Sequence, residues 1–134
     1  MYLLDTNVVS ELRSARPHGA VVAWLNSVDD AELHISAVTL GEIQAGIEMT
    51  RAQNAPRAVE LQAWLDEVAE TYNILSLDGR ILRHWARLMH GRSDNLIEDA
   101  LIAATAQAHG FTVVTRNVRD VALFRVKTFN PFGK

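Results

Sequence analysis

The sequence predicts an α/β protein, a three-layer α/β/α sandwich built on a mostly parallel sheet of four to five strands. Short apolar runs alternate along the chain with longer segments in which apolar residues recur at helical spacing. This alternation is typical of a parallel sheet with helices on both faces. There is no internal repeat or interdomain linker, so we expect residues 1–134 to form a single domain.

The first half of the chain contains two predicted strands and three predicted helices. The run "YLLD" is apolar, ends in an acid and is bounded by "TN", as in a buried strand followed by a turn. The run "ELHIS" has the character of a second short strand. We therefore expect strands at residues 2–5 and 32–36, and helices at residues 7–14, 19–28 and 36–53.

The second half repeats this alternation. Pro56 suits the first position of a helix that runs through residue 71. Strands are expected at 73–77 and 111–117, with an edge strand at 126–132, and helices at 78–91 and 95–110. In the helix at 78–91, the apolar residues Ile81, Leu82, Trp85, Leu88 and Met89 should face inward, and Arg80, Arg83 and Arg87 outward.

The composition limits the possible classes of protein. The formal charge of −3 argues against a protein that coats nucleic acid through its overall charge. The absence of cysteine excludes disulfides and thiolate metal sites. No apolar run approaches the roughly 18 residues of a membrane helix, and the start of the chain is unlike a signal peptide. We therefore expect a cytoplasmic protein with no membrane partner.

Acidic and amide side chains follow the predicted strands. Asp5 comes directly after the first strand, and Asn117 and Asp120 lie in the loop after the fourth. Ligands of open parallel sheets bind beyond the carboxyl ends of the strands. Glu42 and Asp99 are placed near the first turns of helices, and both border apolar stripes. The side chains should therefore meet in one crevice.

Each of these residues also has a purely structural explanation. Short polar side chains cap helices, acids complete capping boxes or favour the positive end of the helix dipole, and asparagine forms turns. On these grounds Asp5 could cap a helix, and the pairs Thr39–Glu42 and Asn95–Glu98 could form capping boxes. Asp99 could be stabilised by the helix dipole. Asp120 could be a solvated loop charge, and Asn117 could form a turn. We assign Glu98 to capping.

Taken together, the acids predict a metal site. Two carboxylates 4 Å apart repel each other by roughly 4 kcal/mol at an effective dielectric of 20, so converging acids need a cation. An all-oxygen pocket suits Mg²⁺ or Mn²⁺. We expect Asp5 and Asp99 to bind the metal, and Glu42 with Asp120 or Asn117 to complete the catalytic set.

Five segments, in order along almost the whole chain, resemble the PIN-domain ribonucleases, specifically VapC-type toxins of toxin–antitoxin pairs. They are "LLDTNVVSELR", "SAVTLGEIQAGI", "EDALIAATAQAHG", "TVVTRNVRDV" and "FNPF". The resemblance implies a five-stranded parallel sheet and Mg²⁺-dependent endoribonuclease activity on single-stranded or loop RNA. It also implies a small antitoxin that occludes the acidic crevice, and a homodimer that forms a hetero-tetramer or hetero-octamer with that antitoxin.

The resemblance assigns the site residue by residue. Asp5, Glu42 and Asp99 match three acids of the family site. This chain has Asn117 where many relatives have a fourth acid, and Asp120 where others have one three residues later. Two other functions remain open: a catalytically degenerate binding partner with the same fold, and a phosphotransfer or phosphatase domain. The phosphotransfer alternative normally needs a lysine or second aspartate near the first acid, and "DTN" offers neither.

Overall fold

The computed structural model, which describes residues 1–133, contains a five-stranded parallel sheet. The strands lie in the order β3-β2-β1-β4-β5, so β1 is central and β5 is at an edge, as the sequence predicts. Tyr2 pairs with both Leu33 and Thr112, which sets the register of the three central strands. The strands are β1 (Tyr2–Leu4), β2 (Leu33–Ser36), β3 (Asn73–Leu75), β4 (Thr112–Val114) and β5 (Thr128–Phe129).

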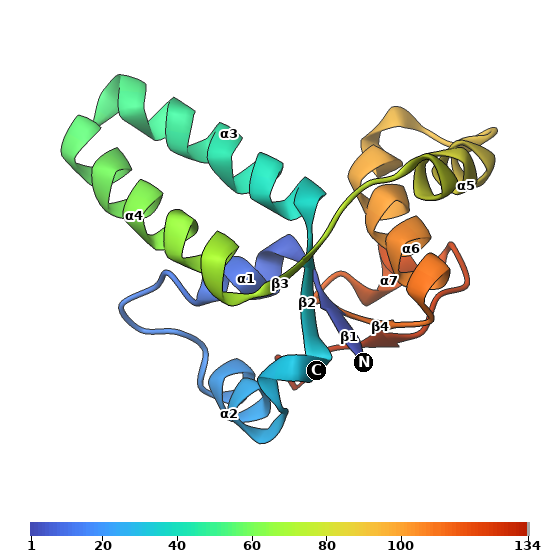
Figure 1. The fold of residues 1–134 in the computed structure, drawn as a ribbon, viewed down its shortest axis with the longest axis horizontal. Coiled ribbons are helices and arrows are strands. Elements are labelled where there is room, and N and C mark those ends of the chain that lie inside the picture. Colours follow the sequence, from blue (N-terminus) through green and yellow to red (C-terminus); the bar gives the residue numbers. More distant parts are fainter. Residues whose placement is uncertain (134) are drawn as a thin grey trace.

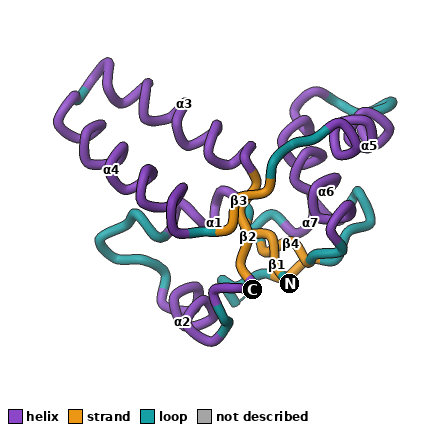
Figure 2. Tube along the Cα trace, in the orientation of Figure 1, coloured by secondary structure: helices purple, strands orange, loops and turns teal. Residues whose placement is uncertain are grey.

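Helices cover both sides of the sheet and confirm the predicted three-layer sandwich. Figure 1 shows α1 to α4 on one side of the strands and α5 to α7 on the other, and Figure 2 shows the short strands between the two helical layers. The helices are α1 (Thr6–Glu11), α2 (Gly19–Ser27), α3 (Ala37–Gln53), α4 (Ala55–Thr71), α5 (Gly79–Met89), α6 (Ile97–His109) and α7 (Val118–Ala122).

The alternation of side chains along the central strands divides the core in two. Leu4 and Val114 pack with residues of α1 to α4, whereas Leu3 and Val113 pack with α6 and α7. All four side chains are fully buried. Because successive residues of a strand point to opposite faces, continuous apolar runs such as "YLL" and "TVV" fit strands covered on both sides.

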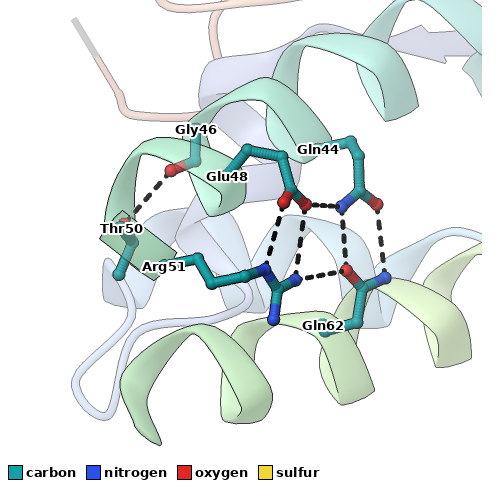
Figure 3. Close-up of polar contacts among 6 residues, drawn as sticks. All are labelled: Gln44, Gly46, Glu48, Thr50, Arg51 and Gln62. Carbon is teal, nitrogen blue, oxygen red and sulfur yellow. Dashed lines mark hydrogen bonds and ion pairs between the residues drawn. The ribbon is translucent and has the colours of Figure 1, made fainter. Parts of the chain in front are cut away.

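Helices α3 and α4 form a hairpin that extends away from the sheet (Figure 1). A polar network joins them, as Figure 3 shows: the side-chain amides of Gln44 and Gln62 exchange hydrogen bonds of 2.8 and 3.2 Å. Arg51 binds both Glu48 and the Gln62 carbonyl oxygen. The turn between the helices ends at Asn54, whose side chain caps α4 by accepting from the Arg57 amide. The network fixes the exposed edge of a hairpin whose other face is apolar.

Helix α5 crosses the outside of α6. The indole of Trp85 donates to the carbonyl of Ile97 at the start of α6, while the neighbouring His84 contacts Gln107 near its end. Ile81 is buried and Arg80, Arg83 and Arg87 are exposed, as predicted. The prediction that Leu82 faces inward is wrong: its side chain is 40% exposed, because only a narrow stripe of α5 touches α6.

The structure contains three short elements that the sequence analysis did not predict: two 3₁₀ turns, Asp30–Glu32 and Asp94–Leu96, and helix α7. Helix α7 occupies part of what was predicted as a loop after the fourth strand, and the strands β3 and β4 are shorter than predicted. One or two turns carry too few residues to show periodicity. None of the helices within residues 1–133 combines the length and hydrophobicity that a membrane-spanning segment requires.

Candidate active site

Asp5 is placed at the carboxyl edge of the central strand. Its amide donates to the carbonyl of Val114 at 2.9 Å, which extends the pairing of β1 with β4 by one residue. The chain then turns into α1, and the Asp5 carboxylate caps that helix by accepting from the Thr6 amide at 2.8 Å. The buried side chains of Val8 and Val9 hold α1 against the sheet. Asp5 is therefore only 6% exposed, and it both caps a helix and faces the edge where ligands bind.

A buried hydroxyl ties Asp5 to the loop after β4. Thr115 Oγ1 donates to Asp5 Oδ2 at 2.8 Å and accepts from the Asn117 amide at 2.9 Å. The Asn7 side chain bridges the same two loops: its Nδ2 donates to Thr115 Oγ1 at 3.2 Å, and its Oδ1 accepts from the Arg116 amide at 3.1 Å. The loops after the two central strands are thus fixed to each other.

Glu42 reaches the same edge from the second turn of α3. Its Oε1 accepts a hydrogen bond of 3.0 Å from Thr6 Oγ1, and this hydroxyl also lies 3.1 Å from the hydroxyl of Thr39. The helix is capped instead by Ser36, whose Oγ accepts from the Val38 amide. The alternative in which Thr39 and Glu42 form a capping box is therefore wrong, and Glu42 points toward the loop after β1.

The first turn of α6 supplies two further acids, Glu98 and Asp99. The assignment of Glu98 to a cap with Asn95 is wrong. A 3₁₀ turn, Asp94–Leu96, leads into the helix, and its N-cap residue Leu96 makes no side-chain capping bond. Asn95 instead pairs with the Ser93 hydroxyl. Because the turn takes over the entry to the helix, Glu98 is free to face the crevice beside Asp99.

These residues line one hollow of about 380 Å³. It lies between the starts of α1, α3, α6 and α7, so every wall comes from the carboxyl edge of the sheet. The part of the chain that the structure describes contributes no lysine, arginine or histidine to this lining. The lining residues are Asp5, Thr6, Asn7, Glu42, Asn95, Glu98, Asp99 and Asn117.

Burial and mutual repulsion raise the pKa of three of the acids. Burial, followed by the neighbouring Glu98 carboxyl, raises the pKa of Glu42 to about 8, although the hydrogen bond from Thr6 opposes this shift. Burial and then the charges of Asp5, Asp120 and Glu98 raise the pKa of Asp99 to about 6. Burial also raises the pKa of Asp5 against the effect of its hydrogen bonds from Thr115 and Thr6. The hollow therefore favours a positive charge.

Asn117 and Asp120 occupy different positions around this hollow. Asn117 lines the hollow. It is also the N-cap residue of α7, but its side chain makes no capping hydrogen bond. Asp120 is exposed in the first turn of α7 and is not a lining residue, but its charge acts on Asp99. The structure thus brings Asp5, Glu42, Asp99 and Asn117 together and leaves Asp120 at the rim.

Comparison with known proteins agrees with this arrangement. The family model described as "PIN domain" matches residues 2–126. This chain belongs to the PIN-domain family. Among its relatives, Toxin FitB from Neisseria gonorrhoeae is 33% identical over 98% of this chain and 99% of its own length. VapC ribonuclease Y4jK from Sinorhizobium fredii is 35% identical over 98% of each chain. The crystal structure of FitAcB from Neisseria gonorrhoeae superposes with a TM-score of 0.87 at 32% identity and covers all of both chains.

The PIN-domain fold of this chain also uses residues that the sequence analysis did not assign to the site. Asn7 joins the loops after β1 and β4 by donating to Thr115, and the Thr39 hydroxyl contacts the Thr6 hydroxyl that binds Glu42. Glu98 adds a carboxylate to the hollow. The hydroxyls of Thr6 and Thr115 donate to the carboxylates of Glu42 and Asp5. For Asn7 and Glu98 the available signal was adjacency, since each stands within two residues of an assigned acid.

Proposed function

We propose that this PIN-domain protein is a metal-dependent endoribonuclease that acts on single-stranded or loop RNA as the toxin of a toxin–antitoxin pair. One observation carries the proposal: carboxylates from the N-cap of α1, from α3 and from α6 converge in a single hollow that has no basic lining residue within 1–133. Two relatives, Toxin FitB and VapC ribonuclease Y4jK, support the class of activity by their names. A small antitoxin, a homodimer and a cytoplasmic location follow from the family resemblance.

The donor set fits a hard divalent ion. Its side chains offer only oxygen ligands, and raised pKa values show that the acids lack a neutralising charge. Within residues 1–133, no three acidic or histidine side chains are close enough to hold an ion directly. Mg²⁺ commonly binds through one or two carboxylates and keeps several waters. Asp5 and Asp99 would hold Mg²⁺ or Mn²⁺, and Glu42 with Asn117 or Asp120 would bind its waters.

The ion would lower the pKa of a bound water and neutralise charge on the scissile phosphate. Glu42 would orient the attacking water and take its proton, since its carboxyl group lines the same hollow as Asp5 and Asp99. The hydrogen bond from Thr6 fixes Glu42 Oε1 and thereby the direction of the carboxyl group. Thr115 keeps Asp5 in place from the opposite wall. Hydrolysis adds one water across one P–O bond.

Single-stranded RNA suits the site better than a duplex, because unpaired segments can bring a phosphodiester into a recessed hollow. The test is digestion of an unstructured oligoribonucleotide by the purified protein, freed of any partner. We expect cleavage with Mg²⁺ or Mn²⁺, none with EDTA, and none by the Asp99→Asn variant. Intact RNA at every Mg²⁺ and Mn²⁺ concentration would overturn the proposal.

A catalytically degenerate binding partner is the second candidate, and Asn117 is the observation that favours it. An amide replaces a carboxylate in the lining, which leaves one charge fewer to attract a cation. The digestion assay separates the two candidates, since a degenerate protein leaves RNA whole while its fold remains intact. The phosphotransfer alternative has no comparable support, because no lysine among the described residues lines the hollow.

A further inference from the structure

The outer surface of α5 carries three arginines that have no partner in the described chain. The side chains of Arg80, Arg83 and Arg87 are exposed, and within residues 1–133 no ion pair or hydrogen bond joins them to another residue. The two ion pairs in this part of the chain, Arg51–Glu48 and Arg57–Glu60, both lie on the α3–α4 hairpin. We refer to Arg80, Arg83 and Arg87 as the arginine face.

The helix dipole disfavours Arg80 and Arg83 and favours only Arg87, which lies in the last turn of α5. Arg80 and Arg83 lie near the N-terminus of the helix, where the helix dipole disfavours positive charge. Arg83 follows Arg80 by three residues, and Arg87 follows Arg83 by four. These spacings place like charges side by side on the helix. No ion pair among the described residues neutralises these charges. An anion bound from outside the chain would do so.

The arginine face is hollowed on two sides. A cavity of about 540 Å³ lies between α5 and the end of α6, lined by Arg80, His84, Arg87, Gln107 and Ala108. A second cavity of about 340 Å³ is lined by Gly79, Arg80, Arg83 and Arg87. The two cavities share Arg80 and Arg87, and no acid of the described chain lines either. Both therefore suit anionic groups.

A hydrogen-bond chain makes the wall between α5 and α6 rigid. Gln107 Nε2 donates to the Phe124 carbonyl at 2.7 Å, which leaves its Oε1 as an acceptor for His84 Nε2 at 2.5 Å. His84 is thus held in the wall of the larger cavity, between Arg80 and Arg87 along the helix. The guanidinium groups are presented from a fixed backbone, and arginine binds phosphate oxygens in bidentate geometry.

One RNA strand can span the arginine face and the acidic hollow. Helix α6 links them, with Asp99 in its first turn and Gln107 eight residues later, about 12 Å along the axis. Phosphates recur about every 3.4 Å along one strand of a duplex, so a few nucleotides cover this distance. The acidic hollow repels a polyanion, whereas the arginine face attracts it.

We propose that the arginine face binds backbone phosphates of the RNA a few nucleotides from the scissile bond. This inference rests on the proposed function, to which it adds a surface that binds the RNA strand outside the cleavage site. The arginine face contributes affinity without base specificity, because phosphates carry no sequence information.

The test is equilibrium binding of a fluorescein-labelled oligouridylate in EDTA, measured by anisotropy across a series of salt concentrations. We expect the triple variant R80Q/R83Q/R87Q to bind at least 10-fold more weakly than the original protein. We also expect the slope of log K against log salt to fall by about 2, at roughly 0.7 per lost contact with a single strand. The matched control R13Q/R16Q/R57Q removes the same number of arginines from other exposed positions and should bind as the original protein does. Circular dichroism and Tm confirm that both variants are folded.

Three results would overturn the inference. Affinity and slope could be unchanged in R80Q/R83Q/R87Q, both triple variants could lose the same affinity, or polyglutamate could displace the RNA from the arginine face at equal charge concentration. The third would assign the face to an acidic protein segment. If the protein cleaves RNA with Mg²⁺ but R80Q/R83Q/R87Q binds RNA as the original protein does, the nuclease proposal stands and the arginine-face proposal fails. If the variant loses binding but no preparation cleaves, the proposed function fails and the phosphate site remains.

Discussion

Thr115 and Asp5, 110 residues apart in the sequence, are joined by a buried hydrogen bond of 2.8 Å from Oγ1 to Oδ2. The bond connects the loops that follow the two central strands, because Asp5 comes directly after β1 and Thr115 directly after β4. It holds the most buried carboxylate of the hollow and lowers its pKa against the opposing effect of burial. The position of a proposed metal ligand thus depends on a residue from the far end of the chain.

The first prediction concerns this bond. Replacing Thr115 by valine keeps the shape but removes the shorter of the two hydrogen bonds to Asp5 Oδ2, the other coming from Asn7 at 3.4 Å, and costs about 1–3 kcal/mol. We expect a lower urea midpoint with an unchanged m-value, and weaker Mg²⁺ binding because Asp5 is less firmly held. Thr115→Ser retains the hydroxyl and should restore both. A valine variant as stable and as active as the original protein would show that the bond is incidental.

The second prediction separates catalysis from stability. Asp99→Asn removes a charge that burial and neighbouring acids disfavour, so the metal-free protein should become more stable. RNA cleavage should fall at least about 100-fold, equivalent to roughly 3 kcal/mol of transition-state stabilisation. Melting in EDTA and digestion with Mg²⁺ measure the two effects. Opposite signs are expected from a site residue, whereas a structural residue would lose stability and activity together.

The fold could be predicted from the sequence because its signals are local and repeated. Continuous apolar runs such as "YLL" mark strands buried on both faces, and apolar residues recur at helical spacing in α5. The carboxyl-edge rule then places Asp5 with the loop after β4 before any contact is known. Glu42 and Asp99 could be selected because they border apolar stripes.

The remaining details depend on tertiary contacts that leave no local pattern. Glu98 has the spacing of a capping residue from Asn95, but the 3₁₀ turn before α6 changes the entry to the helix and gives Glu98 to the hollow. Leu82 fits the apolar stripe of α5, yet α6 covers only part of that stripe. Helix α7 is too short for periodicity, so Asp120 could not be placed on it.

The third prediction is a pH dependence of stability in the absence of metal. Glu42 has a folded-state pKa of about 8 against an ordinary value of 4.5, so the folded protein holds a proton that the unfolded chain releases. This contribution is complete below about pH 4.5 and is lost as pH rises through about 8. Because Glu42 is only half-buried, solvent screening reduces it to roughly 1–2 kcal/mol. Tm in EDTA should therefore fall from pH 5 to pH 8.

Glu42→Gln provides the control for this pH dependence. The amide cannot titrate, so the variant should show a flatter profile between pH 5 and pH 8 than the original protein. The residual slope should be steepest below pH 6, where Asp99, with its pKa of about 6, still titrates. A profile that is identical in both proteins would assign the dependence to other groups.

The fourth prediction tests whether Asn117 weakens the site and whether Asp120 compensates. Asn117→Asp adds a carboxylate to the lining, where it will meet the charges of Asp5, Glu98 and Asp99. Without metal we expect a lower Tm and a higher pKa for Asp99. With Mg²⁺ we expect tighter binding, since ligand charge favours a divalent cation. Bound metal raises stability by RT ln(1 + [Mg²⁺]/Kd), so thermal shift against Mg²⁺ concentration yields Kd without any RNA.

Asp120→Asn is the matched change at the rim. Its charge acts on Asp99 from the first turn of α7, so its removal should lower the pKa of Asp99 and weaken Mg²⁺ binding. If Asp120 supplies the charge that Asn117 lacks, Asn117→Asp should rescue Mg²⁺ binding and RNA cleavage in the Asp120→Asn background. If the two positions serve different purposes, the double variant should bind Mg²⁺ as weakly as Asp120→Asn does. Asp120 would then affect the site only through the electrostatic effect of its charge on Asp99.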